Sequence, residues 1–461
     1  MAERAVDAII IGAGQAGPSL AGRLDATGHK VVLIERHLVG GTCVNTGCKP
    51  TKTLIASAYA AHTARRGSDY GFSVASPVTM DMPAVAARAR KVILDSRRGN
   101  EEWLAGMRNV ELIRGHARFV AEGTVDVNDQ RLTAPKIFIN VGARAQVPDL
   151  PGVDEVPFLT NTDMVALETL PRRLVIVGGS YIGLEFAQMY RRFGAEVTVV
   201  ERADRLIARE DPDVSSAVRE ILEAEGIAIR TGAECISFKA HETGVCVDVD
   251  CKEGEPSVTG THVLLAMGRR PNTDDLGLAQ AGIAVDARGY IGVDDQLQTN
   301  VPGIWALGDC NGRGAFTHTA YNDFEIVAAN LLDGADRRVS QRLPGYALYI
   351  DPPLARVGMT DAEAAKDGRR LLYSKRSMTR VGRAVEKGES QGFMKVVADA
   401  DSRKILGAAI LGTGGDEAIH GILDMMHADQ TIDTLRWAVP IHPTVSELIP
   451  TVLLDLSAKG P

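Results

Sequence analysis

Two glycine-rich turns in this chain of 461 residues follow the same spacing, and they limit the possible folds more than any other feature. The first turn, G-A-G-Q-A-G, follows a short apolar run and contains Gly12, Gly14 and Gly17, with Glu35 lying 23 positions after the first glycine. In such a unit the glycines form a tight turn against a pyrophosphate, and the acidic residue binds ribose hydroxyls. The sequence therefore predicts a dinucleotide-binding unit near the N-terminus.

The second turn, G-G-S-Y-I-G, begins at Gly178 after the apolar run 174–177, and Glu201 again follows 23 positions later. Ser180 replaces the middle glycine, and a helix is expected over about 182–193. Two such units predict an α/β protein that binds two dinucleotides, or a duplicated unit of which one copy has lost its ligand.

A pair of cysteines, Cys43 and Cys48, lies in the stretch G-T-C-V-N-T-G-C-K-P-T-K just after the first unit. An Ala-rich segment without a helix breaker follows, so a helix is expected to start near Cys48, with Pro50 at its beginning. The positive end of a helix favours thiolate over thiol, which predicts redox or nucleophilic chemistry. A structural disulfide, half of a metal site and two buried thiols remain as alternatives.

Composition argues against several other classes of function. A net charge of −8 gives no support to nucleic-acid binding or to an anionic membrane surface. The apolar runs are far shorter than the ~18 residues that a membrane span needs. Six cysteines are too few for a disulfide scaffold, and the N-terminal residues do not resemble a signal peptide, so the cytoplasm is the expected compartment.

His442 and Glu447 are a less specific candidate pair. His442 precedes a proline, which places it on a turn, and Glu447 could orient its imidazole for acid–base work. A plain surface histidine is the alternative. Cys246 and Cys251 lie in an alternating segment that reads as a strand, where positions five apart are about 16 Å apart and cannot be bridged without bending.

No metal site is expected from the remaining residues. Met425, Met426 and His427 fit one face of a helix better than a metal site. Cys235 and Cys310 have no partner indicated by their spacing.

Taken together, the motifs resemble those of the class I pyridine nucleotide–disulfide oxidoreductases. They are the cysteine stretch, the two glycine turns, A-M-G-R-R-P-N-T, A-L-G-D and H-P-T-V-S-E, spread along the whole chain. The resemblance implies two Rossmann-like dinucleotide-binding domains plus a C-terminal α+β dimerisation domain, with FAD on the first unit, NADH or NADPH on the second, and a homodimer. The implied boundaries are 1–150 with 270–340 for the FAD-binding domain and its central part, 151–269 for the NAD(P)H-binding domain and 341–461 for the interface domain.

The resemblance also implies individual roles. Cys48 is the thiolate next to the flavin and Cys43 the thiol that meets the substrate, while Lys52 lies near the flavin and pairs with Glu185. Tyr181 covers the flavin until nicotinamide displaces it, and the implied acid–base pair for the other subunit's thiol is His442 with Glu447. The implied cofactor-binding residues are Gly12, Gly14, Gly17, Glu35, Thr42, Lys52, Ala117, Asp309, Gly178, Gly179, Tyr181, Ile182, Glu201 and Gly268.

The implied reaction passes electrons from NAD(P)H through the flavin and the Cys43–Cys48 disulfide to a small oxidised thiol or oxidant. Within the family, Y-I-D-P-P-L-A-R-V-G-M-T and I-L-G-T-G-G-D-E-A-I-H are most similar to the mercuric-reductase-like branch that includes the reactive chlorine resistance flavoprotein. The chain lacks the C-terminal cysteine pair of mercuric reductases and has His442 where they carry tyrosine. A dihydrolipoamide dehydrogenase subunit and a Cu(II) or Hg(II) reductase remain as alternatives.

The choice of coenzyme depends on charges after the second unit. Glu201 favours NADH, because a carboxylate binds the ribose diol and repels a 2′-phosphate. Arg202 and Arg205 favour NADPH, so NADH is preferred without excluding the other coenzyme. Lys49, between Cys48 and Pro50, adds positive charge beside the thiolate and has no assigned role.

Overall fold

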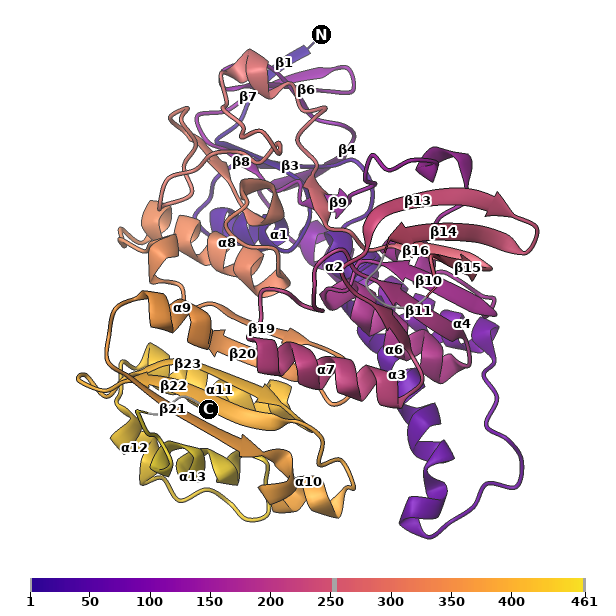
Figure 1. Ribbon diagram of the computed structural model, residues 1–461. Coiled ribbons are helices and arrows are strands. Elements are labelled where there is room, and N and C mark those ends of the chain that lie inside the picture. The colour runs from indigo at the N-terminus through magenta and orange to yellow at the C-terminus, as the bar shows by residue number, and fades with distance from the viewer. Residues whose placement is uncertain (1, 251–254, 459–461) are drawn as a thin grey trace.

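The computed structural model describes residues 2–250 and 255–458, so Cys251 lies outside the described residues. Three parts of the chain are visible in Figure 1, each built around its own main sheet. The first glycine turn belongs to the upper part, the second to the right-hand part, and the C-terminal third forms the lower left part.

The first main sheet is parallel and carries the first glycine turn. Its central strands are fully buried, as expected for a parallel sheet with both faces covered. Helix α1 (Ala16–Ala26) follows the turn and buries Leu20 and Leu24 in the same core cluster as α8 (Thr317–Leu332). The strand order is β18 (Ile304–Ala306), β8 (Ile137–Ile139), β2 (Ala8–Ile11), β3 (Val31–Glu35) and β4 (Val110–Arg114).

The second main sheet repeats this arrangement around the second glycine turn. Helix α6 (Tyr181–Phe193) follows the turn, is buried along most of its length and ends at Gly194, and α7 (Pro212–Ala224) covers the sheet further along. The four parallel strands are ordered β12 (Ala228–Arg230), β11 (Glu196–Val200), β10 (Arg173–Val177) and β16 (His262–Leu265). A short helix, α5 (Asn161–Met164), precedes them.

The third main sheet is antiparallel and lacks a glycine turn of this kind among the described residues. Its strands are ordered β19 (Gly345–Leu348), β20 (Leu354–Gly358), β23 (Ile405–Leu411), β22 (Phe393–Asp399) and β21 (Leu371–Ser377). The helices of this part are α9 (Asp361–Lys366), α10 (Gly382–Glu386), α11 (Gly415–His427), α12 (Ile432–Arg436) and α13 (Ile449–Leu454). Met425, Met426 and His427 lie at the end of α11.

Three smaller sheets complete the fold. One contains β1 (Ala2–Ala5), β7 (Gln130–Thr133), β6 (Thr124–Val127) and β5 (Arg118–Ala121), and another contains β13 (Glu234–His241), β14 (Gly244–Asp250) and β15 (Ser257–Gly260). Cys246 lies on β14, a strand as its alternating pattern predicts. The antiparallel pair β9 (Ala143–Ala145) and β17 (Arg269–Pro271) lies near the predicted boundaries at 150 and 270, which remain predictions.

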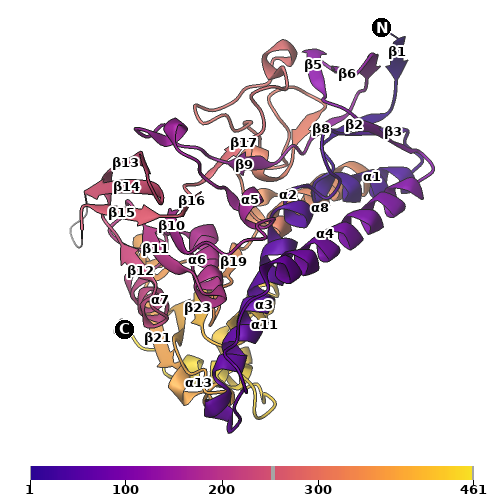
Figure 2. The same ribbon diagram turned by 90° about the vertical axis from the view of Figure 1, so that its right-hand side faces the viewer.

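The cysteine stretch forms two helices rather than one. Cys43 is in the short helix α2 (Gly41–Asn45), and Cys48 is the first residue of α3 (Cys48–Arg65). The expectation that a helix starts near Cys48 is therefore met, but Pro50 is its third residue, still within the turn where a missing N–H costs nothing. Helix α4 (Met82–Ala105) lies alongside α3 (Figure 2).

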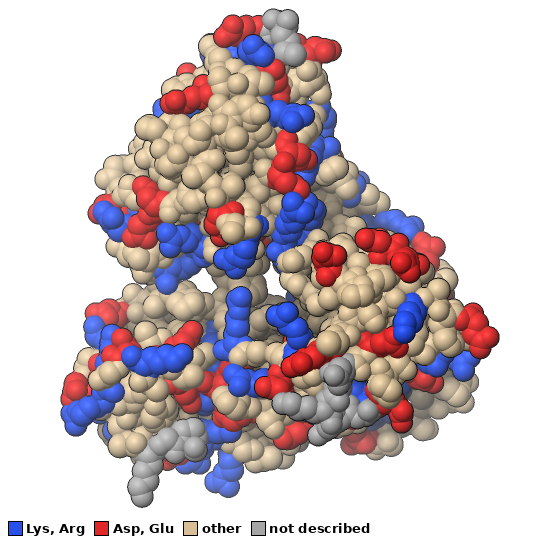
Figure 3. Space-filling view, turned by 45° about the horizontal axis from the view of Figure 1, so that its top comes forward, with Lys and Arg blue, Asp and Glu red and all other residues tan. Residues whose placement is uncertain are grey.

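The surface mixes charges of both signs. On the face in Figure 3, Lys and Arg side chains alternate with Asp and Glu, and a hollow lies where the three parts meet. Among residues 2–250 and 255–458, no helix is both long enough and apolar enough to cross a membrane.

Candidate active site

A cavity of about 1650 Å³ runs between the first and second parts of the chain. It exceeds the roughly 300–1,000 Å³ of a typical small-molecule pocket, which leaves space for more than one ligand. Residues from both glycine turns line it, together with Cys43 and Cys48. The cavity therefore connects the two predicted nucleotide sites to the two thiols.

Cys43 and Cys48 contact each other inside this cavity. A hydrogen bond from Cys43 is the largest effect on Cys48, and with further contributions from Thr317 and Lys52 it lowers the pKa of the Cys48 thiol to about 6. The same hydrogen bond, together with burial, raises the pKa of Cys43 far above its ordinary value. The reduced pair therefore carries a thiolate at Cys48 and a proton on Cys43.

Two further groups fix the surroundings of Cys48. The Cys48 Sγ lies 3.2 Å from the hydroxyl of Thr317, the first residue of α8. One turn along α3, the ammonium group of Lys52 pairs with the buried Glu185 of α6 at 2.6 Å. Glu185 also accepts a hydrogen bond from the Tyr349 backbone N–H at 3.0 Å. This pair ties the cysteine helix to the helix of the second glycine turn.

The first glycine turn leaves no space for side chains. A Cβ on Gly12 would lie 2.2 Å from the Asn140 carbonyl oxygen, and one on Gly17 would lie 2.2 Å from the Gly12 carbonyl oxygen. The Glu35 carboxylate accepts the backbone N–H groups of Ala13 at 2.8 Å and His37 at 2.7 Å. This tight turn beside an acidic residue fits the pyrophosphate and ribose of FAD.

The second turn repeats this geometry. A Cβ on Gly178 would lie 2.4 Å from the Ala266 carbonyl oxygen. The Glu201 carboxylate accepts the backbone N–H groups of Gly179 at 2.6 Å and Ala203 at 2.7 Å, as Glu35 does in the first unit. The residues present therefore fit a second dinucleotide at this turn.

Asp309 and Tyr181 both line the cavity. Burial raises the pKa of the Asp309 carboxyl above its usual range, although Arg269 lies 3.3 Å away and opposes the shift. Tyr181, the first residue of α6, lines the cavity, and its ring meets that of Phe316 edge-on at 6.4 Å between centroids. Two aromatic rings in contact with each other therefore form part of the cavity wall.

His442 and Glu447 lie away from this cavity. The His442 Nδ1 is 2.9 Å from a Glu447 carboxylate oxygen, and the histidine side chain is 79% exposed. The turn predicted from Pro443 is present. Three apolar side chains just before it are also strongly exposed: Trp437, Val439 and Ile441.

The structure brings most of the predicted site residues to one cavity. Those that line it are Gly12, Gly14, Glu35, Thr42, Cys43, Cys48, Lys52, Ala117, Gly179, Tyr181, Ile182, Glu185, Glu201, Gly268 and Asp309. Gly17 and Gly178 are outside its lining because they form the turns behind it, and His442 and Glu447 are outside it because they lie on another surface of the same chain.

Sequence reasoning missed several residues that shape the cavity. Asn140 accepts the Gly17 N–H at 3.1 Å and donates to the Leu307 carbonyl at 3.0 Å, so it holds the first turn against a neighbouring strand. An asparagine directly after the apolar run I-F-I was the available signal. Thr317 had no such signal, because its contact with Cys48 spans 269 positions.

Comparison with known families decides the identity of this arrangement. Residues 6–323 match the family described as pyridine nucleotide-disulphide oxidoreductase, and residues 345–453 match the dimerisation domain of that family. The chain belongs to this family. It is accordingly a flavoprotein disulfide reductase that uses FAD and a pyridine nucleotide, and its C-terminal part is a dimerisation domain.

Several known proteins are similar over almost the whole chain. The probable pyridine nucleotide-disulfide oxidoreductase RclA of Escherichia coli (strain K12) is 34% identical over 449 residues, covering 95% of this chain and 97% of that protein. The mercuric reductase of Bacillus cereus is 32% identical over 441 residues, covering 96% and 70%. The dihydrolipoyl dehydrogenase of Bacillus subtilis is 32% identical over 448 residues, covering 96% and 94%.

A solved structure supports the same assignment. The Cu(II) complex of the HOCl-induced flavoprotein disulfide reductase RclA from Escherichia coli matches with a TM-score of 0.89 at 33% identity, covering 98% of this chain and 99% of that one. The predicted fold class, with two Rossmann-like domains and a C-terminal dimerisation domain, is confirmed.

Proposed function

We propose that this enzyme reduces a small disulfide or sulfenyl-type oxidant through Cys43, with Cys48 as the second thiol of the pair. The observation that carries the proposal is the contact between these two thiols in the cavity that both glycine turns line. FAD, when bound, accepts hydride from the nicotinamide and passes two electrons to a disulfide. The HOCl-induced relative supports an oxidant as the final acceptor.

The thiol steps follow from the unequal acidities. In the reduced enzyme the Cys43 sulfur attacks the oxidised sulfur of the substrate, forming a mixed disulfide while the first leaving group departs with its electron pair. The Cys48 thiolate then attacks the Cys43 sulfur, releases the remaining substrate thiolate and forms the Cys43–Cys48 disulfide. Because the raised pKa keeps Cys43 protonated, its attack requires a base.

His442 from a second copy of the chain is the base that we propose. With the Nδ1 proton directed at Glu447, the Nε2 atom is the free acceptor. Its exposed position beside Trp437, Val439 and Ile441 suits a subunit interface, and the match to the dimerisation domain supports a homodimer. The proton that His442 takes from Cys43 can then pass to the substrate thiolate that leaves in the second step.

Lys52 and Glu185 have an electrostatic role in this proposal. The Lys52 ammonium contributes to the low pKa of Cys48, and the 2.6 Å contact with Glu185 fixes its direction. A fixed cation near the isoalloxazine ring also stabilises negative charge that arrives there. Asp309 and Glu35 are proposed to hold the ribitol and the adenosine ribose.

NADH is the proposed coenzyme. The anchored Glu201 carboxylate lines the cavity, whereas Arg202 and Arg205 are outside its lining. The Arg205 guanidinium donates instead to the carbonyl oxygens of Ala208 at 2.8 Å and Glu210 at 3.2 Å. Steady-state kinetics should therefore give a higher kcat/KM with NADH than with NADPH, and Glu201→Gln should reduce the difference. A clear preference for NADPH would contradict this assignment.

A substrate panel tests the proposed function. Glutathione disulfide, lipoamide, hypothiocyanite, Cu(II) and Hg(II) are offered to the holoenzyme while NADH oxidation is followed, in wild type and Cys43→Ser. We expect turnover of a sulfur oxidant that Cys43→Ser abolishes. Cu(II) is the second candidate, because a similar structure is a Cu(II) complex. Full activity of Cys43→Ser on the preferred substrate would show that electrons leave the enzyme without Cys43.

A further inference from the structure

Tyr181 is part of a cluster of three aromatic rings at the edge of the cavity. Its ring meets Tyr346 edge-on at 5.4 Å between centroids, and Tyr346 stacks on Phe316 at 5.8 Å with an angle of 10° between planes. Tyr181 and Phe316 line the large cavity, whereas Tyr346 lies behind them and lines a neighbouring one. Tyr346 therefore supports the Tyr181 ring from the side away from the cavity.

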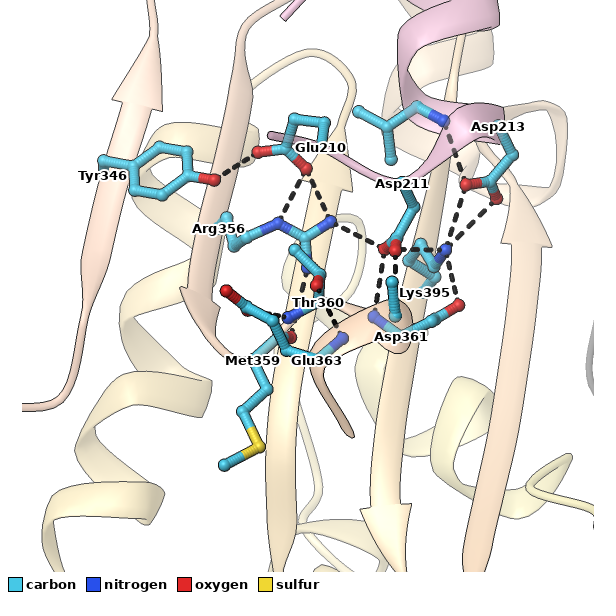
Figure 4. Close-up of polar contacts among 12 residues, drawn as sticks. Glu210, Asp211, Asp213, Tyr346, Arg356, Met359, Thr360, Asp361, Glu363 and Lys395 are labelled. Atoms are coloured by element: carbon cyan, nitrogen blue, oxygen red, sulfur yellow. Dashed lines mark hydrogen bonds and ion pairs between the residues drawn. The ribbon is translucent and has the colours of Figure 1, made fainter. Parts of the chain in front are cut away.

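The Tyr346 ring behind Tyr181 is anchored to a buried carboxylate. The Tyr346 hydroxyl donates its proton to Glu210, which fixes the ring that meets Tyr181 edge-on (Figure 4). Burial raises the pKa of Tyr181 to about 12, so its hydroxyl stays protonated at neutral pH.

Glu210 is itself fixed from the third part of the chain. Its second oxygen accepts the Nε–H of Arg356 on β20 at 2.7 Å, and the side chains of Glu210 and Arg356 are 0% and 2% exposed. Arg356 also bonds Asp211 at 3.1 Å, and Lys395 joins Asp211 to Asp361. Figure 4 shows these groups between the strands of the third sheet and the start of α7. A buried, charged network of this kind holds Glu210 in one position.

We propose that Tyr346, held by Glu210 and Arg356, is a positioning residue that keeps the Tyr181 ring in its closed position over the nicotinamide region. The inference rests on the proposed function, in which nicotinamide displaces Tyr181. To move, Tyr181 must give up its edge-on contact with the anchored Tyr346 ring. Tyr346, which lies outside the cavity lining, thus favours the closed position of Tyr181. Coenzyme binding must supply the free energy that separates the closed position from the open one.

A consequence for affinity follows. When only an open fraction of the protein binds a ligand, the apparent dissociation constant rises as that fraction falls. Removing the Tyr346 hydroxyl keeps the aromatic ring but removes the hydrogen bond to Glu210 that fixes this ring against Tyr181. Tyr346→Phe should therefore lower the dissociation constant of NADH by about threefold to tenfold, the range that a single hydrogen bond supports.

Isothermal titration of the oxidised holoenzyme with tetrahydro-NADH, which cannot donate hydride, measures this constant directly. We expect tighter binding in Tyr346→Phe and a parallel fall in the KM for NADH that exceeds any change in kcat. Tyr59→Phe is the matched control, because Tyr59 also donates to a glutamate, Glu389, at 2.8 Å but lies outside the cavity lining. The dissociation constant of Tyr59→Phe for tetrahydro-NADH should equal that of the wild type.

The outcomes separate the positioning role from the underlying function. Unchanged or weaker binding in Tyr346→Phe, with folding intact by circular dichroism, overturns the positioning role alone. A wild-type protein that binds neither FAD nor tetrahydro-NADH overturns the proposed function as well. Glu210→Gln provides a second variant, and it should tighten binding in the same direction if the anchoring of Tyr346 by Glu210, rather than the Tyr346 ring alone, keeps Tyr181 in place.

Discussion

Cys43 and Cys48 show how far two identical side chains can diverge within one site. Each is the main influence on the other, because the hydrogen bond between them raises the pKa of Cys43 and lowers that of Cys48. Thr317 lowers the pKa of both thiols, while Lys52 adds to the lowering at Cys48. Position in the helices matters as well, since Cys48 begins α3 while Cys43 lies inside α2. The division of roles between nucleophile and electron relay therefore rests on a few neighbouring groups.

The acidity of Cys48 can be measured in the reduced protein. Its pKa of about 6 lies below the free-thiol value of 9.0, so the thiolate persists as pH falls and protonates only near 6. The stabilisation that it gives the folded, reduced protein is complete above pH 9.0 and is lost as pH falls through about 6. Ultraviolet thiolate absorbance of the apoprotein should titrate with that midpoint. The signal should disappear in Cys48→Ser, and a midpoint near 9.0 would contradict the assignment.

Removing the Thr317 hydroxyl should weaken this effect. The hydroxyl lies 3.2 Å from the Cys48 sulfur and lowers its pKa by hydrogen bonding. Thr317→Val should therefore raise the titration midpoint above that of the wild type. Ser57→Ala, a hydroxyl loss further along α3, should leave the midpoint unchanged, and an equal shift in both variants would point to a general change in the helix.

At the scale of elements, the two strand–turn–helix units are near copies. Gly12 and Gly178 both adopt positive φ, 106° and 121°, and both approach a carbonyl oxygen of a neighbouring strand too closely for a side chain. Glu35 and Glu201 each accept two backbone N–H groups around their own turn. The carboxylate therefore stabilises the backbone of the turn beside it.

Gly178→Ala should disable one nucleotide site and spare the other. The new Cβ would meet the Ala266 carbonyl at 2.4 Å in a left-handed backbone conformation, so the second turn must shift. Backbone strain of about 1–3 kcal/mol should raise the KM for NADH by about tenfold or more while FAD stays bound. Gly99→Ala on α4 is the control, since a Cβ there meets no atom within 4 Å. Loss of FAD from Gly178→Ala would show that the two turns are not independent.

At the scale of the whole molecule, the second and third parts are joined by buried charges. The Lys395 Nζ contacts Asp211 at 3.2 Å, Asp213 at 3.0 Å and Asp361 at 2.7 Å, and its side chain is 3% exposed. Burying an ammonium group without a partner costs several kcal/mol, about the scale of the whole stability of a domain, so the Lys395 charge depends on these carboxylates. The contact fixes the second glycine unit relative to the antiparallel sheet.

Lys395→Met should therefore destabilise the protein strongly. Loss of the ammonium group leaves buried carboxylates unpaired, and the free energy of unfolding should fall by about 3–5 kcal/mol in urea denaturation. Lys375→Met is the matched control. Lys375 bonds the same Asp213 at 2.8 Å but is 31% exposed, so its loss should cost about 1 kcal/mol or less. Equal losses in the two variants would show that burial does not set the cost.

The exposed apolar segment before His442 gives a prediction about assembly. Val439 is 95% exposed and Ile441 81% exposed, so a charge at Val439 should have little effect on the single chain and a large one on a subunit contact. Val439→Asp should elute as a monomer in size-exclusion chromatography with light scattering, with activity lost. Val385→Asp, on the exposed surface of α10, should remain a dimer. A fully active Val439→Asp monomer would exclude His442 as a base acting between subunits.

The sequence predicted the local parts of this site, and the family resemblance supplied one long-range pair, Lys52 with Glu185, which the structure shows at 2.6 Å. Other long-range contacts were missed. Glu35 and Glu201 could be located because their spacing from a glycine turn is fixed by one strand–turn–helix unit. The placement of Cys48 at a helix start followed from its neighbours, while the separate helix around Cys43 did not, because G-T-C-V-N is too short to show a period. Tyr346, Glu210 and Arg356 lie up to 146 positions apart, so only the fold brings them together.

The buried charges that surround Arg356 and Lys395 have a consequence for motion. Swinging the second glycine unit away from the antiparallel sheet would separate buried groups of opposite charge, a far larger cost than rotating one phenol ring. We therefore expect admission of the coenzyme to need a rotamer change of Tyr181 within a fixed frame. The rate of that step should follow the chemistry of one side chain, and solvent viscosity, which slows large domain movements, should hardly alter it.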